Sequence, residues 1–383
     1  MTQHFNPLNI CIVSHLAYGA MKGGSSGHAG GVEHQTSLMA RWLAARGHRV
    51  TLLTWDEGIN EEETIEGVHI IKMCRQNEGL PVVRFFYPRW TSLIRAMKMA
   101  DAELYYHNCA EYVTGQVARW CKSHGQRFIY SVASDADCEL KSPELKKLHD
   151  RLFFRYGLRR AAQIIVQTRK QQRLLLDNYG LSSIILPMPC QVPVNNKNPK
   201  KHLPNNGNPR IVWVGRIDRV KRLELLLDIA EAIPDIVFDI AGKPTYPEDP
   251  YCQNLLARAE KMANVNMQGM VPQNRMRDLY QCASLLCNTS LYEGFPNTFL
   301  EAWSYGIPVV STFDPDKLLT DKKLGIYAEN KSEIISGIKI LLEDKPLWQK
   351  MSANARQYFE DNHSLDQAME KFEKVFNKVR NST

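Results

Sequence analysis

The chain has 383 residues, 44% of them hydrophobic, and carries a formal net charge of +7 at pH 7. That length allows two domains, each with a hydrophobic core of its own. No apolar stretch approaches the roughly 20 residues that a membrane-spanning helix needs, and the start has no signal-peptide pattern. We therefore expect a globular, cytoplasmic protein. The moderate positive charge favours an anionic ligand or an acidic membrane surface over nucleic acid.

The nine cysteines are scattered along the chain and form no C-x-x-C pair. Several lie in apolar runs that read as strands. Reduced, mostly buried thiols are the expected state, which agrees with an intracellular setting.

The first half alternates between strand and helix patterns. Residues 9–15 read as a buried strand, 16–31 as a long Gly-rich loop, 32–47 as a helix and 48–55 as the next strand. Similar alternation continues through further strands at 102–108, 127–134 and 163–168, with helices at 116–125 and about 144–162. This pattern predicts a doubly wound parallel α/β domain over residues 1–190.

Residues 191–208 are dense in Pro, Asn, Lys and Gly and read as a linker. The alternation then restarts, with strands at 210–215, 236–242, 265–269 and 284–290 and helices at 222–233 and 275–283. A second α/β domain is expected over residues 209–360. Apolar residues at helical spacing predict a terminal helix over residues 361–383, packing back toward the N-terminal domain.

Two basic residues follow the first strand of the second domain, in the sequence "VGRIDRVKR". Arg216 and Lys221 would lie at the carboxyl edge of the sheet, where ligands bind in such folds. A guanidinium and an ammonium together suit a diphosphate, although an exposed basic turn is the plain alternative.

The segment "EGFPNTFLEAWSYGIP" places one glutamate in a turn and another in the helix that follows. Asn297 is expected to cap that helix and Gly306 to end it. The amides near Thr298 and Phe299 would favour an anion. Glu301, one turn in, suits sugar hydroxyls better than phosphate, and Glu293 would face another part of the same ligand. One anion site would thus lie between two carboxylates. A sugar nucleotide matches this order, because its diphosphate lies between the ribose and the sugar.

Taken together, "GRIDRVKR", "QGMVP" and "EGFPNTFLEAWSYGIPVVS" resemble the retaining GT-B glycosyltransferases of family 4, with their two glutamates eight positions apart. The early "GGVEHQ" is similar to their first Gly-rich loop. The resemblance extends in order over nearly the whole chain. It implies two Rossmann-like domains facing a central cleft, the first for the acceptor and the second for the donor.

The resemblance also implies roles for individual residues. Glu301 corresponds to the ribose-binding glutamate, and Glu293 to the one near the donor sugar. Arg216 and Lys221 correspond to the diphosphate clamp, and His107 to a histidine near the donor sugar, although a lone histidine is often structural. The resemblance assigns the remaining contacts to backbone groups. The backbone of Gly30 and Gly31 would contact the diphosphate, and that of Met270 and Val271 the nucleobase. The amides at the helix start belong to Asn297, Thr298 and Phe299.

The implied activity is transfer of a sugar, with retention of anomeric configuration, from a nucleotide-sugar to a glycan or lipid-linked acceptor. Such enzymes commonly assemble surface polysaccharides or glycolipids. No metal and no cofactor besides the donor are expected, and a UDP-sugar is favoured over a GDP-sugar. Three departures from the common family pattern leave donor choice open: Arg222 where a glycine often stands, a single glycine at Gly242, and "NTSLYEG" before the first glutamate.

Three other interpretations stay open. Asp135 and Asp137 have the D-x-D spacing of metal-binding glycosyltransferases of another fold. The loop "GGSSGHAGG" is Gly-rich as in dinucleotide oxidoreductases, but its glycine spacing does not match theirs. A catalytically inactive relative that binds or assembles sugar polymers is the third, although this chain keeps both glutamates and both basic residues.

A basic stretch, "RLFFRYGLRRAAQ", suggests peripheral contact with the inner face of an anionic membrane. Its arginines are Arg151, Arg155, Arg159 and Arg160, and Phe153 and Phe154 lie beside them. An ordinary helix with a charged outer face is the alternative.

Overall fold

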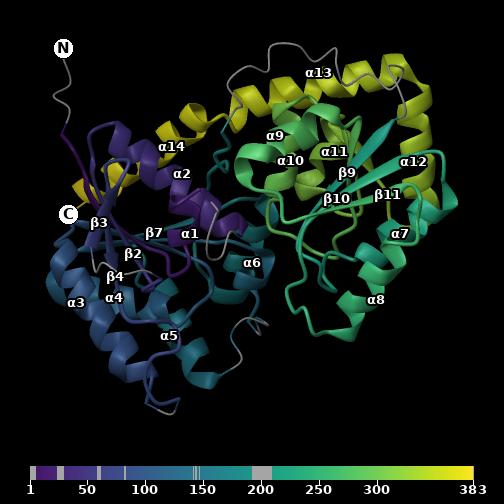
Figure 1. Ribbon diagram of the computed structural model, residues 1–383. Helices are drawn as coiled ribbons and strands as arrows, with labels where there is room; N and C mark the ends of the chain where they lie inside the picture. Colours follow the sequence, from purple (N-terminus) through teal and green to yellow (C-terminus); the bar gives the residue numbers. More distant parts are fainter. Residues whose placement is uncertain are drawn as a thin grey trace, which may run out of the picture. The chain divides into compact units, whose positions relative to one another are not determined.

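The computed structural model describes residues 6–23, 30–57, 62–81, 83–140, 142, 145, 147–191 and 209–382 (Figure 1). The chain divides into two compact units. The first consists of Met1–Pro189 and Leu365–Thr383, and the second of Cys190–Ser364. Apart from Gln191, the expected linker lies outside the described residues.

The first unit is built on an eight-stranded sheet in the order β3-β4-β2-β1-β5-β6-β7-β8. Neighbouring strands are parallel, except that β3 runs antiparallel to β4. The strands are β1 (Asn9–Val13), β2 (Arg49–Thr54), β3 (Glu62–Ile65), β4 (Val68–Lys72), β5 (Leu104–Asn108), β6 (Arg127–Ser131), β7 (Gln163–Val166) and β8 (Ile184–Ile185).

Helices connect these strands and cover the sheet. They are α1 (Tyr18–Met21), α2 (Gly31–Ala45), α3 (Thr91–Ala100), α4 (Val113–His124), α5 (Leu148–Leu158) and α6 (Arg169–Tyr179). The short α1 lies inside the segment that the sequence predicted as loop. The expected basic helix is shorter than predicted and corresponds to α5.

The sheet of the first unit has a hydrophobic layer on each face, because successive strand residues point to opposite sides. In β1, Cys11 and Val13 join one buried cluster, whereas Ile10 and Ile12 join the other. Burial on both faces explains why these parallel strands are apolar throughout.

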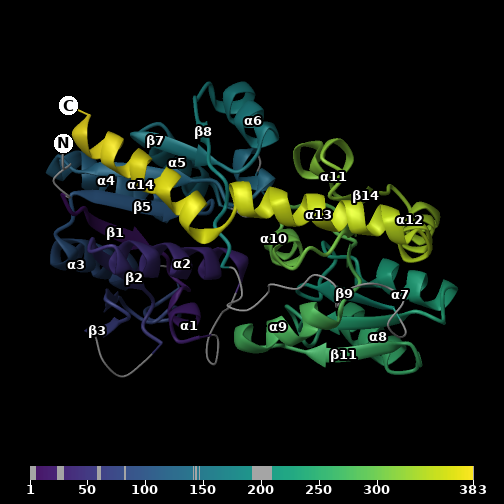
Figure 2. The same cartoon turned by 90° about the horizontal axis from the view of Figure 1, so that it is seen from above.

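The C-terminal helix α14 (Leu365–Asn381) belongs to the first unit and lies beside α2 (Figures 1 and 2). Met369, Phe372 and Phe376 are buried in the same cluster as Ile10 and Ile12. Polar contacts fix its position, since Trp42 Nε1 donates to Asp366 at 2.7 Å and His48 Nε2 lies 2.8 Å from Glu373.

The second unit has a six-stranded, fully parallel sheet in the order β11-β10-β9-β12-β13-β14. Its strands are β9 (Arg210–Val214), β10 (Val237–Ala241), β11 (Val265–Gly269), β12 (Leu285–Asn288), β13 (Val309–Ser311) and β14 (Gly325–Tyr327). Its helices are α7 (Leu223–Ala232), α8 (Pro250–Ala259), α9 (Gln273–Cys282), α10 (Asn297–Ser304), α11 (Leu318–Asp321), α12 (Lys331–Glu343) and α13 (Lys345–Asn362).

Each unit is therefore a doubly wound α/β domain, which confirms the predicted fold class. In both sheets the strand order reverses direction beside the first strand, between β1 and β5 in the first unit and between β9 and β12 in the second. Ligands in open α/β sheets bind outside the carboxyl ends of the strands at such a reversal.

Candidate active site

Two loops meet where the strand order of the second unit reverses. One follows β9 and runs to α7, and the other follows β12 and runs to α10. Because β9 and β12 are parallel neighbours, both loops leave the same edge of the sheet.

An ion pair joins these two loops. Lys221 Nζ contacts Glu293 Oε1, and both side chains are largely buried. The same carboxylate oxygen accepts from Ser290 Oγ at 2.7 Å and from Asn288 Nδ2 at 3.5 Å. Among the described residues no contact uses Oε2 of Glu293, so this oxygen can accept from a ligand.

Hydrogen bonds from side chains hold the loops together on either side of this pair. Thr289 Oγ1 donates to the Lys221 carbonyl at 2.7 Å and accepts from Trp213 Nε1 at 3.1 Å. Arg222 Nε donates to the Thr289 carbonyl at 2.7 Å. Arg222 has a φ of +49°, a backbone conformation that glycine adopts more easily. The hydrogen bond from its guanidinium to Thr289 therefore helps to stabilise a backbone conformation that a glycine would adopt without such a bond.

Arg216 lies on the outer side of the same turn. Its side chain is 68% exposed, and its Nε is 3.7 Å from Asp218 Oδ2. Behind it, Gly215 and Gly242 pass so close that a Cβ on Gly242 would come within 1.8 Å of the Gly215 carbonyl oxygen. Only glycine fits at Gly242, which keeps the ends of β9 and β10 together beneath Arg216.

Glu301 occupies a different environment, on α10 and partly buried. Tyr280 donates a hydrogen bond of 2.6 Å to its Oε2, and the ring of Tyr280 stacks on Tyr305. Burial raises the pKa of Glu301 to about 7, and the Tyr280 bond opposes that shift. This carboxyl group can therefore change its charge near neutral pH.

The start of α10 differs by one residue from the prediction. Pro296 is the N-cap and Asn297 is the first helical residue, so the expectation that Asn297 caps the helix is wrong. The Phe299 amide donates to the Pro296 carbonyl at 3.0 Å. Thr298 is thus the better candidate for an amide contact with an anion, since amides of the first helical turn lack intrahelical partners. Gly306, with a φ of +69°, ends the helix as predicted.

Met270 and Val271 follow β11 at the edge of the sheet, on the same carboxyl side. Met270 is exposed, and the carbonyl of the preceding Gly269 accepts from the Gly242 amide at 2.8 Å.

His107 lies in the first unit, on β5 at the reversal of strand order. Its Nδ1 is 2.8 Å from the carbonyl of Val13 on β1. A carbonyl only accepts, so Nδ1 carries the proton and the neutral ring presents Nε2 as an acceptor. Burial lowers the pKa of His107. Within the described part of the chain Nε2 has no partner, which is unusual for a buried polar atom.

Gly30 and Gly31 begin α2 in the first unit, with Gly30 as the N-cap. The Glu33 carboxylate lies against Gly30, because a Cβ there would come within 2.3 Å of Glu33 Oε2. A diphosphate that approached the Gly30 backbone would therefore meet a like charge.

The carboxylates of the D-x-D motif already have protein partners. Asp137 accepts from the amide of Ala133 at 2.8 Å and from Ser134 Oγ at 3.0 Å, which closes a capping turn. Asp135 pairs with Lys170 at 2.7 Å. No group of three possible metal ligands occurs among the described residues. The motif thus stabilises the turn that follows β6 and holds it against α6.

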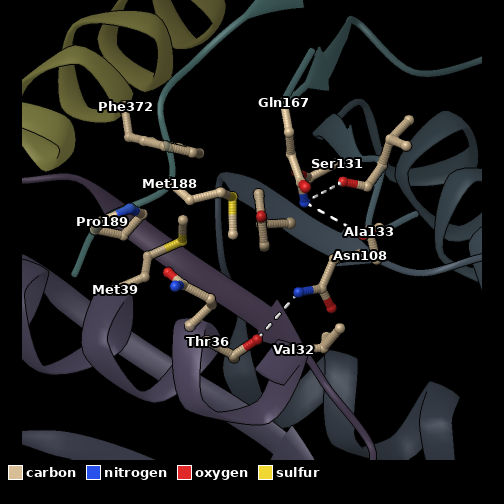
Figure 3. Close-up of a pocket in the computed structure, with 13 residues that line it drawn as sticks. Val32, Thr36, Met39, Asn108, Ser131, Ala133, Gln167, Met188, Pro189 and Phe372 are labelled. Atoms are coloured by element: carbon tan, nitrogen blue, oxygen red, sulfur yellow. Dashed lines mark hydrogen bonds between the residues drawn. The ribbon is translucent and has the colours of Figure 1, made fainter. Parts of the chain in front are cut away.

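A small cavity lies at the carboxyl ends of β5 and β6 in the first unit (Figure 3). Asn108 Nδ2 donates to Thr36 Oγ1 at 3.1 Å on one side, and Gln167 Nε2 donates to the Val132 carbonyl at 3.0 Å on the other. The cavity has a volume of about 20 Å³, which is enough space for one water molecule and too little for a sugar.

Sequence reasoning missed Ser290, Asn288 and Tyr280, the three side chains that hold the two glutamates. A signal for the first two is visible in the sequence, because β12 ends in the polar run "NTS" directly after an apolar stretch. Tyr280 gives no such signal, since it contacts Glu301 only through the packing of α9 and α10.

Two family models together match most of the chain, one in each unit. The model described as "Glycosyl transferase 4-like domain" matches residues 30–185, and "Glycosyl transferases group 1" matches residues 194–358. This chain belongs to the family-4 GT-B glycosyltransferases. It has no helix within the described residues that is long and apolar enough to cross a membrane.

Among other glycosyltransferases, an uncharacterised one from Haemophilus influenzae is 25% identical over 56% of this chain and 60% of its own. The alpha-galactosylglucosyldiacylglycerol synthase of Streptococcus pneumoniae is 31% identical over 26% of this chain and 27% of its own. The matched regions thus span between about a quarter and three fifths of the length of these relatives.

Solved GT-B structures share the fold along nearly the whole chain. Sucrose-phosphate synthase from Thermosynechococcus elongatus has a TM-score of 0.77 at 17% identity and covers 97% of this chain and 98% of its own. Anabaena HepE, in complex with UDP-glucose, has a TM-score of 0.74 at 15% identity over 96% and 99% of the two chains.

Proposed function

We propose that this glycosyltransferase transfers a sugar, with retention of configuration and without a metal, from a nucleotide-sugar to a glycan or lipid-linked acceptor. The observation that carries the proposal is the ion pair of Lys221 and Glu293 at the strand-order reversal of the second unit. It brings a cation and an acceptor carboxylate together where ligands bind in such sheets.

The donor diphosphate would take its charge partners from Arg216 and Lys221. Arg216 is exposed on the turn, and the ammonium of Lys221 is held in place by Glu293. Both charges stabilise the negative charge that grows on the leaving diphosphate, and the amide of Thr298 adds a third donor. The leaving phosphate oxygen then takes the proton of the acceptor, so no side chain needs to act as nucleophile.

The hydroxyls of the donor are assigned to three acceptors. Glu301 accepts from the ribose, Glu293 Oε2 from the sugar, and His107 Nε2 from a further sugar hydroxyl. Each atom is an acceptor with the capacity for one more bond in its described surroundings. The backbones of Met270 and Val271 would contact the base, and those of Gly30 and Gly31 the diphosphate once Glu33 has moved aside.

The base of the donor is proposed to be uracil, by analogy with the UDP-glucose complex of HepE. Surface polysaccharide or glycolipid assembly on the cytoplasmic side is the corresponding role, as the name of the diacylglycerol synthase illustrates for its own protein.

Calorimetric titration with UDP, GDP and ADP, without added metal, tests the donor site directly. We expect saturable binding of UDP that weakens in Glu301→Ala. Binding of another nucleotide instead would replace uracil by that base, and binding of none by the folded protein would contradict the donor site altogether. Release of sugar from UDP-sugars, followed by NMR of the anomeric proton of the product, then distinguishes retention from inversion.

A further inference from the structure

A pocket opens at the amino edge of the sheet in the first unit, between the ends of α3 and α4. Both helices end shortly before a strand begins, α3 before β5 and α4 before β6. The pocket has a volume of about 280 Å³, close to the lower end of the range of about 300–1,000 Å³ that is usual for small-molecule sites. Six of the side chains that line it are Lys98, Asp101, Tyr105, Trp120, His124 and Gln126. We call it the amino-edge pocket, since it lies at the opposite end of β5 from His107.

Trp120 and His124, one turn apart on α4, form a stacked pair in the wall of this pocket. Their ring centroids are 3.6 Å apart, and their planes differ by 23°. His124 Nδ1 lies 3.0 Å from the Trp120 carbonyl and 3.0 Å from Ser123 Oγ, which itself donates to that carbonyl at 2.9 Å. Both neighbours therefore act as acceptors, so Nδ1 carries the hydrogen and the ring is fixed on the indole. Because His124 is exposed while one face of its ring is covered, the other face is open to an apolar group.

Hydrogen bonds fix two further side chains of the amino-edge pocket. The hydroxyl of Tyr105, a residue that is 1% exposed, donates to the Met97 carbonyl at 3.0 Å and so ties β5 to α3. The amide nitrogen of Gln126, in the orientation that its neighbours require, donates to the carbonyls of Ala102 and Glu103, each at 3.2 Å. The pocket is thus preformed, as binding sites for small molecules usually are.

Lys98 and Asp101 bring opposite charges to this pocket. Both are exposed, and within the described part of the chain neither side chain forms a hydrogen bond or an ion pair, not even with the other. The backbone of Asp101 is engaged instead, because its carbonyl accepts from Asn9 Nδ2 at 2.8 Å. The ammonium therefore keeps its donors and the carboxylate its acceptor sites for a ligand, while the two charges cancel.

We propose that the amino-edge pocket binds a neutral sugar residue of a glycan. A pyranose ring has an apolar face of C–H groups, which suits the open face of His124. Its hydroxyls both donate and accept, which suits the combination of Lys98 with Asp101. A phosphate or a nucleotide would meet the Asp101 carboxylate, and a cationic ligand would meet the Lys98 ammonium.

Such a pocket would give the enzyme a second hold on a glycan. A chain that is bound here has a raised local concentration at the protein, as multivalent binding generally provides. The inference concerns sugar binding alone, so it stands or falls independently of the donor and the acceptor proposed above.

Saturation-transfer NMR with the methyl glycosides of glucose, galactose, mannose and N-acetylglucosamine tests the proposal. At least one of these glycosides should receive saturation from the protein. His124→Ala removes the open ring face and Asp101→Gly removes the carboxylate, and each should weaken the binding by about tenfold or more, because a direct contact with the sugar is lost. Both variants should fold, since His124 is exposed and Asp101 has a φ of +39°, a backbone conformation that glycine adopts easily.

The matched control is Lys122→Ala, at an exposed position of α4 that does not line the amino-edge pocket. It should bind the glycoside like the wild type, and circular dichroism should show that all three variants are folded. Binding that survives both pocket substitutions would overturn the proposal, because the sugar would then occupy another site. So would the absence of binding by all four glycosides, or a preference for inorganic phosphate or adenosine monophosphate that His124→Ala abolishes.

Discussion

At the scale of single residues, the ionisation of Glu301 makes a prediction about pH. Its pKa is raised to about 7 by burial, so in the empty site it is largely protonated below neutral pH. Ribose hydroxyls that donate to this group favour the carboxylate, so nucleotide binding lowers the pKa and releases a proton. Affinity should therefore rise as the pH is raised to about 7 and level off above it.

Calorimetry over this pH range, in buffers of different ionisation enthalpy, measures both the affinity and the released proton. Glu301→Gln serves as the control, because it keeps the shape but cannot titrate. The terminal phosphate of a nucleoside diphosphate also titrates, so the difference between wild type and variant is the relevant quantity. If the difference in affinity between the wild type and Glu301→Gln stays constant with pH, Glu301 takes no part in nucleotide binding.

Lys221 carries the second prediction at this scale. Lys221→Ala should lower turnover by about 10²–10³, since it removes one donor to the charge that develops on the leaving group. The fold should persist, because Glu293 keeps its bonds from Ser290 and Asn288. Arg219→Ala is the matched control: it removes a positive charge from the same turn, but Arg219 is 68% exposed and pairs with Asp249. Equal turnover of the two variants would remove Lys221 from the mechanism.

The sequence identified the charged residues of the candidate site but not their partnership. Lys221 and Glu293 are 72 positions apart, and they meet only because β9 and β12 are neighbours in the sheet. Strands are visible in a sequence as apolar runs, whereas their order depends on packing that no local pattern records. The same limit applies to Asp135 and Asp137, because a capping turn and a metal site can share one spacing.

At the scale of elements, Thr289 connects the two loops that carry the candidate site. Its buried hydroxyl bonds both Trp213 Nε1 and the Lys221 carbonyl. Thr289→Val keeps the shape but leaves both groups unpaired, which should cost about 1–3 kcal/mol for each of them. Urea denaturation measures the loss, and nucleotide affinity should fall with it. Thr289→Ser retains the hydroxyl and should keep most of the stability; if it behaves like the valine variant, the hydroxyl does not hold the loops.

Elements with strong apolar spacing could be predicted, whereas the β3–β4 hairpin and several helices, among them α3, α6, α8, α12 and α13, were missed. The turn of the hairpin consists of Glu66 and Gly67, which both have positive φ, at 49° and 80°. Such two-residue turns favour Asn-Gly or Asp-Gly, and Glu-Gly is a weaker signal of the same kind. The strand Glu62–Ile65 is also partly exposed at the sheet edge, so it lacks the apolar run that marked the buried strands.

At the scale of the whole molecule, the C-terminal helix connects the end of the chain to the first unit. Its residues Phe372 and Phe376 are almost fully buried there, although the chain passes through the entire second unit before it returns. The helical spacing of the apolar residues alone predicts that the face of the helix with Phe372 and Phe376 must be covered. Which domain covers it follows from the contacts with Trp42 and His48.

Each unit has its own hydrophobic core, so a cavity in one should destabilise that unit selectively. Phe376→Ala removes a fully buried ring that contacts Tyr106 and should cost about 3–5 kcal/mol. Hydrogen exchange should accelerate in β1 and β5, while exchange in β9 and β12 stays unchanged. Phe376→Leu fills most of the space and should show a smaller effect in the same strands. Equal acceleration in β9 and β12 would instead mean that the two units unfold as one.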